Sequence, residues 1–393
     1  MTGKRRFFIF FLAALALVCG GCSVPSGQTT AQVSPASVVT LSVLAGQSTS
    51  DAGIEEMIDQ MLAESCPGIK LEWECVDWGE VFIPRMTARF GSGDITDIII
   101  GKAQDVATYA AWGNLAPLPD FCFEKIPPSF LPNVTISDQV FGLPYNMQYQ
   151  GVLYNKEIFN TLGLAPPKTL EEFARVVEVL LDHDIVPVAI HYQEAWSVGN
   201  LIMQFLKGEL FPQTPDWGDR FRSGTVSFST SVEARRCFAR IEELMGYSWP
   251  DVLSVDQFES DSRFAAGQSA MYITGTWSLQ LIHELAPDLA VGIFPFPNAA
   301  GNNRLLVEPN ISFMKSAQTS HGVEVDRVLA CIFNDAALAA DVADYTKTIS
   351  VLPSVSNELP NGVQADIDGY VAEKQLYDVT IGNGLIYNKN TTE

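Results

Sequence analysis

Tryptophan side chains close to small and polar residues are the positions in this sequence best suited to bind a small molecule. Trp277 comes two residues after Gly275, and Trp196 lies in the short polar segment 194–197. An indole ring can stack on the apolar C–H face of a sugar ring, while planar polar side chains bind its hydroxyl edge. Packing in a core is the competing interpretation for both rings. Weaker aromatic candidates are Trp78 and Trp112, and three further tryptophans are expected to be structural: Trp73, Trp217 and Trp249.

Motifs of the common enzyme classes are absent from the sequence. There is no GxSxG, HExxH or phosphate-binding loop, and Gly91-Ser-Gly93 lacks the third glycine of a dinucleotide fingerprint. The histidines are scattered, so no metal site is expected. A carboxylate pair for glycoside hydrolysis stays open, because such pairs are defined by distance in space. We therefore expect a binding protein that is not an enzyme and needs no cofactor.

The first part of the chain alternates between strand-like and helix-like segments. The pattern predicts strands at 40–44, 69–76 and 97–100, and helices at 54–62, at 81–90 and after Lys102. Such alternation favours a parallel sheet covered on both faces, with ligands bound beyond the carboxyl ends of its strands. Polar residues at those ends are binding candidates: Gln47, Ser48, Lys102, Gln104 and Asp105. Each could also be an ordinary loop residue.

A second α/β unit follows. Apolar runs predict strands at 152–155 and 185–190, and Thr169 with Glu172 predicts a capping box that opens a helix. Another helix is expected at 232–245. Some 350 residues are too many for one hydrophobic core, so the sequence predicts two lobes.

The amino terminus is typical of a secretory signal peptide. Three basic residues, 4–6, precede the apolar run 7–18, which is too short to span a membrane. Gly20-Gly21-Cys22 resembles the lipobox of bacterial lipoproteins, although Cys19 stands where an aliphatic residue is usual. We expect a signal peptide at 1–21, acylation of Cys22 and a flexible tether at 22–37. An unlipidated signal peptide is the alternative.

Five cysteines follow the signal region, and their pairing is open. They are Cys66, Cys75, Cys122, Cys237 and Cys331. An odd number leaves at least one thiol free. Cys66 and Cys75 could form a bridge, but we favour unpaired cysteines that act as small apolar residues.

The formal charge of −22 becomes −25 once the three basic residues of the signal peptide are removed. A surface this acidic repels nucleic acid, so no nucleic-acid partner is expected.

Several motifs, in this order along the chain, closely resemble extracellular solute-binding protein family 1, the group that contains the maltose-binding protein. The matching blocks are Thr96-Asp-Ile-Ile-Ile100, Gly142-Leu-Pro-Tyr145, Leu153-Tyr-Asn-Lys-Glu157, Leu162-Gly-Leu164, Pro166-Pro-Lys-Thr169, Phe264-Ala-Ala-Gly267 and Gly275-Thr-Trp277. The resemblance implies an α/β, two-lobed periplasmic-binding-protein-like fold of type II, with discontinuous lobes joined by three hinge crossings.

The crossings implied by the resemblance lie near 145–150, 291–297 and 350–354. They divide the chain into an N-lobe, 38–147 plus 298–349, and a C-lobe, 148–297 plus 350–393. Further helices usually follow the third crossing in this family, so the resemblance implies that either the last segment of the C-lobe is incomplete or the chain is truncated.

The resemblance also implies a function and further site residues. It places a stacking aromatic at Trp277 and adds candidates at the crossings: Tyr145, Asn146, Gln148, Glu308 and Asn310. We expect a monomeric receptor, secreted and anchored to the outer face of the cell membrane through Cys22. It would capture a carbohydrate, most simply an oligosaccharide, between its lobes and deliver it to ABC permease subunits. A surface lipoprotein that degrades or retains glycans, and a sensory ligand-binding module, are the alternatives.

Overall fold

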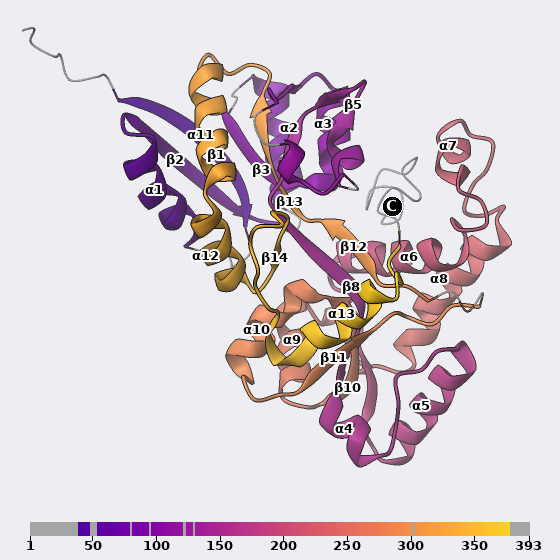
Figure 1. Ribbon diagram of the computed structural model, residues 1–393. Helices are drawn as coiled ribbons and strands as arrows, with labels where there is room; N and C mark the ends of the chain where they lie inside the picture. The colour runs from indigo at the N-terminus through magenta and orange to yellow at the C-terminus, as the bar shows by residue number, and fades with distance from the viewer. Residues whose placement is uncertain are drawn as a thin grey trace, which may run out of the picture. The chain divides into compact units, whose positions relative to one another are not determined.

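The computed structural model describes residues 38–47, 53–78, 81–93, 96–120, 123–128, 130–299, 301 and 303–377 (Figure 1). Several predictions fall outside the described residues: the signal peptide, Cys22, the tether, Ser48, Cys122 and the segment after 377.

The first sheet contains the predicted strands of the N-lobe. Its strand order is β2-β1-β3-β13-β4, and β7 also pairs with β13. These strands are β1 Val39–Gln47, β2 Ile69–Asp77, β3 Ile98–Lys102, β4 Leu115–Ala116, β7 Gly142–Pro144 and β13 Ile311–Ser316. The neighbours of β1 are parallel to it, as expected, but β13 runs antiparallel to β3, β4 and β7. The sheet is therefore mixed and not wholly parallel.

Alternation along β1 places helices on both faces of this sheet. Leu41, Val43 and Ala45 belong to one core with α1, α11 and α12, whereas Leu44 belongs to another core with α2 and α3. The helices are α1 Ile54–Ser65, α2 Phe82–Ser92, α3 Val106–Ala111, α11 Gly322–Asn334 and α12 Ala336–Thr346. In Figure 1, α1, α11 and α12 lie on one side of the sheet, and α2 and α3 lie on the other.

The second sheet is built around one long strand, β8. Its order is β11-β8-β10-β9, and β12 and β14 also pair with β8. The strands are β8 Asn146–Asn155, β9 Val186–Ala189, β10 Ser269–Gly275, β11 Val291–Phe294, β12 Leu306–Pro309 and β14 Ile349–Ser350. A short hairpin, β5 Thr135–Ile136 and β6 Gln139–Val140, stands apart.

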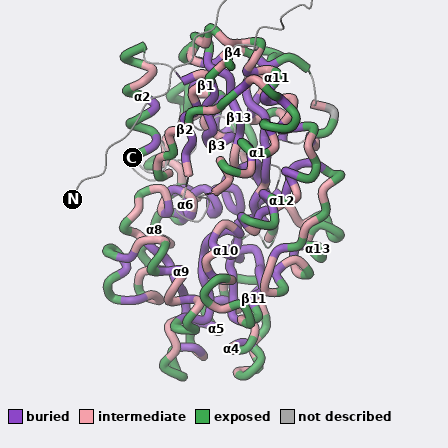
Figure 2. The backbone as a smooth tube through the Cα atoms, turned by 90° about the vertical axis from the view of Figure 1, so that its left-hand side faces the viewer, coloured by how far each residue is buried: buried purple, intermediate pink, exposed green. Residues whose placement is uncertain are grey.

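The second sheet is also covered on both faces. Met271 and Ile273 pack with α5, α6 and α8, while Tyr272 between them packs with α9, α10 and α13. Helices of this unit are α4 Lys156–Thr161, α5 Leu170–Asp182, α6 Ala195–Glu209, α7 Trp217–Arg222, α8 Val232–Met245, α9 Gln257–Ala265, α10 Leu279–Leu285 and α13 Val363–Ala372. Figure 2 shows α6 as one of the most deeply buried of these helices.

The chain passes between the sheets at three positions, and the second and third differ from the prediction. The first passage is at Tyr145, between β7 and β8, inside the predicted range. The second was expected at 291–297, but β12 still pairs with β8, so the chain leaves the second sheet only at Asn310. The third passage precedes β14, which pairs with Met147 and Asn146, slightly earlier than predicted.

The start of α5 follows the predicted capping pattern in part. Thr169 Oγ1 accepts a hydrogen bond from the Glu172 backbone N–H at 3.1 Å. The Glu172 carboxylate accepts a hydrogen bond from the backbone N–H of Lys168 at 2.6 Å, whereas in a capping box it would accept from the N–H of the next residue, Thr169.

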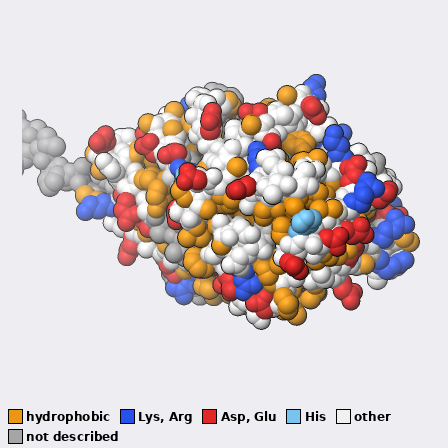
Figure 3. All heavy atoms as spheres, turned by 90° about the horizontal axis from the view of Figure 1, so that it is seen from below, with side chains coloured by type: hydrophobic (Ala, Val, Ile, Leu, Met, Phe, Trp, Pro, Cys, Tyr) orange, Lys and Arg blue, Asp and Glu red, His pale blue; other side chains and the backbone are white. Residues whose placement is uncertain are grey.

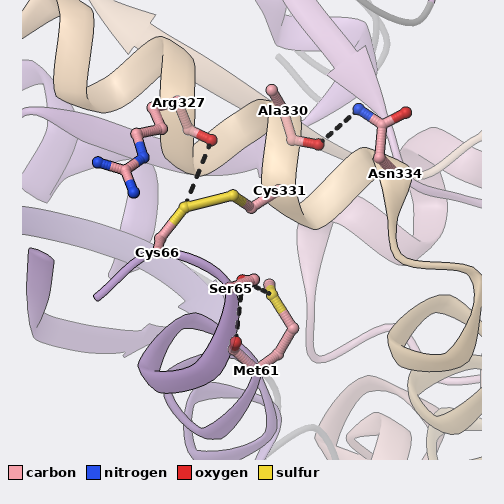
Figure 4. Close-up of a disulfide and its surroundings, with 7 residues drawn as sticks. All are labelled: Met61, Ser65, Cys66, Arg327, Ala330, Cys331 and Asn334. Atoms are coloured by element: carbon pink, nitrogen blue, oxygen red, sulfur yellow. Dashed lines mark hydrogen bonds between the residues drawn. A yellow bond between two sulfur atoms is a disulfide. The ribbon is translucent and has the colours of Figure 1, made fainter.

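A disulfide joins Cys66, at the end of α1, to Cys331 in α11 (Figure 4). The expectation of unpaired cysteines is therefore wrong for these two residues, and Cys66 does not pair with Cys75. The reason is tertiary: α1 and α11 pack on the same face of the first sheet, which brings together residues 265 positions apart. Cys75 is free and exposed, and Cys237 is free and buried.

The surface reflects the acidic composition. The face in Figure 3 carries Asp and Glu side chains among Lys and Arg, in a sequence with 46 acidic and 24 basic residues. Among the described helices, none is both long and apolar enough to cross a membrane.

Candidate ligand-binding site

Trp277 lies in a short turn between β10 and α10. Gly275 ends the strand, and a Cβ at this position would lie 2.0 Å from Cζ3 of Trp277, so only glycine allows the indole to lie against the strand. Thr276 Oγ1 accepts a hydrogen bond from the backbone N–H of Tyr149 at 3.1 Å, which ties the turn to β8. The ring of Trp277 is half-buried and held by rigid elements on both sides.

Trp196 lies in the first turn of α6 and packs against buried His191. Their ring centroids are 5.1 Å apart in an edge-to-face arrangement. His191 Nδ1 is 2.9 Å from Glu194 Oε2, which also accepts the backbone N–H of Gln257 at 2.8 Å. Burial raises the pKa of Glu194, but the hydrogen bond and charge of His191 and the bond from Gln257 more than offset it, so the pKa lies below its usual value. The carboxylate therefore orients the imidazole beneath Trp196.

The two indoles form a corner. Their centroids are 6.3 Å apart and their planes meet at 68°. They line a small pocket that is open to solvent. Its lining residues all come from the C-lobe: Gln150, His191, Trp196, Ser197, Asn200, Leu201, Gln204, Ile273, Thr274 and Trp277. Two aromatic faces edged by amides and hydroxyls suit a molecule with apolar faces and a polar rim.

Helix α6 supplies one wall of this pocket through a repeat of four residues. Trp196, Asn200 and Gln204 lie on one face of the helix, while most other positions of α6 are buried in the core. The Gln204 side chain is 6% exposed, and its Oε1 has no hydrogen-bond partner among the described residues. A buried amide oxygen without a partner is costly and marks a place where a ligand can bind.

A buried polar layer adjoins the pocket along β8 and β12. Glu308 Oε1 accepts hydrogen bonds from the amides of Gln150 and Gln148, at 3.3 Å from the latter. Lys207 Nζ of α6 lies 3.9 Å from Glu308 Oε2. Of these residues only Gln150 lines the pocket, so Gln148 and Glu308 support its floor and do not face it.

The N-lobe candidates form a separate group at the carboxyl ends of β1, β2 and β3. Trp78 lies on Gly46, where a Cβ would come within 2.1 Å of the indole, and Lys102 Nζ lies 4.2 Å from the ring centroid. The same ammonium donates to Asn310 Oδ1 at 2.7 Å. Burial raises the pKa of Asp105 to about 7, although Lys102 lowers it.

Other predicted residues of the N-lobe have different neighbours. Gln47 Nε2 donates to Glu55 Oε2 at 2.8 Å, Gln104 is half-buried in the turn before α3, and Trp112 is 55% exposed. None of the residues in these two groups lines the pocket at Trp277 and Trp196.

The residues at the crossings have structural contacts. Tyr145 is buried between Phe313 and Phe333, with ring centroids 5.3 and 5.7 Å away. The Asn146 side chain accepts from the backbone N–H of Ile311 at 3.0 Å and donates to Thr348 at 3.3 Å. Asn146 thus binds all three crossing segments together, which is the role of a hinge residue.

The structure therefore brings Trp277 and Trp196 together, and it adds six polar residues that the sequence analysis did not predict. They are Gln150, His191, Ser197, Asn200, Gln204 and Thr274. Three of them carried a sequence signal: His191 directly follows the predicted strand 185–190, and Asn200 and Gln204 repeat the spacing of Trp196 in an otherwise apolar helix. No group of three potential metal ligands occurs among the described residues.

Asp261 of α9 lies next to Ser278, the residue after Trp277, and predicts a pH dependence of stability. Burial raises the pKa of Asp261 from 3.8 to about 7, although hydrogen bonds from Ser278, Tyr272 and Gln257 lower it. The folded protein therefore holds a proton that the unfolded chain releases between about pH 4 and 7. The proton on Asp261 therefore contributes to the free energy of unfolding. This contribution is fully present below pH 4 and is lost as the pH rises through 7, at a rate of at most about 1.4 kcal/mol per pH unit.

Asp261→Asn retains the shape of the neutral acid and should remove this dependence. We expect the variant to melt close to wild type near pH 5 and above it at pH 8. Calorimetric melting temperatures at pH 5, 6, 7 and 8 measure the difference. A difference in melting temperature between the variant and wild type that stays constant with pH would contradict the prediction.

Comparison with known proteins identifies the family. A model of the bacterial extracellular solute-binding protein family matches residues 45–339. The chain belongs to this family. The resemblance read from its motifs is thereby confirmed.

Relatives of this family member are distant in sequence. A binding protein of Brucella abortus is 24% identical over 293 residues, which are 65% of this chain and 66% of that protein, so the chain spans just under two thirds of its relative. The multiple sugar-binding protein of Streptococcus mutans is 22% identical over 74% of this chain and 70% of its own. The melibiose/raffinose/stachyose-binding protein of Bacillus subtilis is 22% identical over 75% of this chain and 68% of its own length.

Solved structures share the fold. A solute-binding protein in complex with raffinose has a TM-score of 0.73 at 16% identity and covers 90% of this chain and 99% of its own. A chitin oligosaccharide-binding protein has a TM-score of 0.74 at 20% identity, and the match covers 89% of this chain and 90% of that protein. These neighbours confirm the predicted type II, two-lobed α/β fold.

Proposed function

We propose that this protein is an extracellular receptor that captures a carbohydrate, most simply an oligosaccharide, and delivers it to an ABC permease. The observation that carries the proposal is the corner of Trp196 and Trp277, edged by the amides of Gln150, Asn200 and Gln204. Apolar faces together with directional polar groups match the two kinds of surface on a pyranose. The names of two relatives, which refer to sugars, support the same class of ligand.

Release and delivery require a change of conformation, and the crossings provide a place for it. The two lobes are connected at Tyr145, at Asn310 and just before β14, and hydrogen bonds of Asn146 join these segments. Rotation about so few residues would let the N-lobe close over the pocket, where Trp78 and Lys102 are placed at strand ends to meet the ligand. The lobe boundaries that we propose are thus the predicted ones, with the second moved to Asn310 and the third moved to just before β14.

Anchoring completes the proposal. The mature protein would begin at an acylated Cys22 and be held at the outer face of the membrane by the tether 22–37. Mass spectrometry of the protein from its native membrane should find acyl chains on Cys22, and a mature chain without them would refute the anchor.

A panel of sugars tests the function. The domain beginning at Val38 should gain stability with a subset of melibiose, raffinose, stachyose and chitin oligosaccharides, by about 2.7 kcal/mol at 100 times the dissociation constant. Small-angle scattering with that sugar should give a smaller radius of gyration. Chromatography after incubation should recover the sugar unchanged, because cleavage would favour a glycan-degrading protein. No shift with any sugar would contradict a carbohydrate receptor.

A further inference from the structure

The side-chain amide of Gln204 is one of two polar groups in the pocket lining with a buried atom that has no hydrogen-bond partner among the described residues, and the other is the indole N–H of Trp277. The Gln204 amide is buried on α6, and its oxygen lacks a hydrogen-bond partner in the described part of the chain. Most buried side-chain amides elsewhere in the protein are bonded. Asn155 Oδ1, for example, accepts two backbone N–H groups at 2.9 and 3.1 Å at the start of α4. Folding of α6 therefore buries an amide oxygen to which no described residue donates a hydrogen bond.

The ionisable groups of the C-lobe beside the pocket are already paired within the protein, and Lys102 of the N-lobe, which donates to Asn310 Oδ1 at 2.7 Å, lies outside the pocket lining. His191 contacts Glu194 at 2.9 Å, and Lys207 lies 3.9 Å from Glu308, which also accepts two amide groups. Recognition of a carboxylate or phosphate would need a cation that is not already neutralised by a buried acid. The buried polar atoms of the lining that lack a hydrogen-bond partner among the described residues are both neutral, namely the amide oxygen of Gln204 and the indole Nε1 of Trp277.

The apolar part of the pocket limits how the ligand can lie. Trp196 and Trp277 meet at 68°, and Leu201 and Ile273 close the space between them. A ring stacked on one indole presents its edge to the other. Gln204 lies in the lining of the same corner, so its amide can meet the polar edge of that ring.

We propose that Gln204 is the residue that determines specificity in this site, and that its amide binds adjacent hydroxyl groups of an uncharged pyranose held in the corner of Trp196 and Trp277. The inference rests on the proposed function and extends it to a ligand class, neutral sugars, and to one recognition residue. An amide carries a donor and an acceptor side by side, which matches neighbouring hydroxyls that each donate and accept. A site built around such bonds discriminates strongly against ligands that cannot make them.

Calorimetric titration of the mature protein tests the ligand class. The neutral probes are melibiose, raffinose and di-N-acetylchitobiose, and the acidic probe is digalacturonate. We expect at least one neutral probe to bind and digalacturonate to bind at least 10-fold more weakly. Equal or tighter binding of digalacturonate would overturn the inference while leaving a carbohydrate receptor in place.

Two variants test the residue with the tightest neutral probe. Gln204→Met retains the length of the side chain and Gln204→Leu its approximate volume, and both remove the amide. We expect each to weaken binding about 10- to 100-fold, because two hydrogen bonds are lost. The ligand-free melting temperature should be unchanged or higher, since an unsatisfied buried polar group is replaced by an apolar one.

Asn155→Ala is the matched control, because it removes a buried amide whose bonds are made within the protein. It should lower the melting temperature and leave affinity unchanged. Wild-type affinity in both Gln204 variants would overturn the assignment of Gln204 without affecting the proposed function. Weak binding together with a large fall in melting temperature would indicate a structural role and also overturn it. Failure of wild type to bind any probe would refute the proposed function and the inference together.

Discussion

Replacing Trp277 by alanine should remove most of the sugar affinity and leave the ligand-free protein folded. The indole is half-buried, it lines the pocket, and its support comes from Gly275 and the turn bonded to β8. Loss of a central aromatic contact costs about 2 kcal/mol or more, which is roughly 30-fold in the dissociation constant. The reduction should be larger if Trp196 also loses its packing partner in the corner.

The matched control is Trp217→Ala. Trp217 is 3% exposed, stacks on Phe221 at 5.3 Å and does not line the pocket. Deletion of such a core side chain typically lowers the free energy of unfolding by about 3–5 kcal/mol. Calorimetric affinity and the ligand-free melting temperature should therefore separate the two variants. A Trp277→Ala protein that binds normally, or that melts as early as Trp217→Ala, would disprove the assignment of Trp277 as a stacking platform.

Removal of the disulfide between Cys66 and Cys331 should destabilise the N-lobe. The bond links the end of α1 to α11 across 265 positions of sequence, so it restricts a very large loop of the unfolded chain. Cys331→Ser should lower the free energy of unfolding by about 2–5 kcal/mol. The pocket at Trp277 lies in the other lobe, so affinity for sugar should change little.

Thermal unfolding with and without a reductant measures this effect. Wild type should melt earlier when reduced, whereas Cys331→Ser should not respond. Cys75→Ser is the matched control, since Cys75 is a free, exposed thiol, and it should behave as wild type. Alkylation of both Cys66 and Cys331 in the unreduced, unfolded protein would show that the bond does not form.

Much of the local structure could be read from the sequence because local patterns determine it. The period of two in β1 and the helical spacing after Ile54 reflect burial against a neighbouring layer, and both predicted elements are present. Helix α8 occupies the predicted range, 232–245. The ordered motifs from 96 to 277 indicated the family, and with it the two-lobed fold, because they recur at the turns and strand ends of that fold.

Contacts between distant segments decided the rest. Continued pairing of β12 with β8 moved the second crossing from 291–297 to Asn310, and the packing of α1 against α11 decided which cysteines pair. Tyr145 and Asn146 remain predicted binding residues, and their contacts with residues more than 150 positions away could not be read from the sequence.

The candidate site shows the same division. From the residue types alone, Trp196 and Trp277 could be identified as possible platforms, and the four-residue spacing of Asn200 and Gln204 was visible in the sequence. That the two indoles meet at 68°, with the unbonded amide of Gln204 in the same pocket, required the packing of α6 against β10. A sequence records which side chains a helix carries and on which face, because those depend on the helix period. Which face of another element they meet depends on the whole core, since burial free energy is shared among residues far apart in the chain.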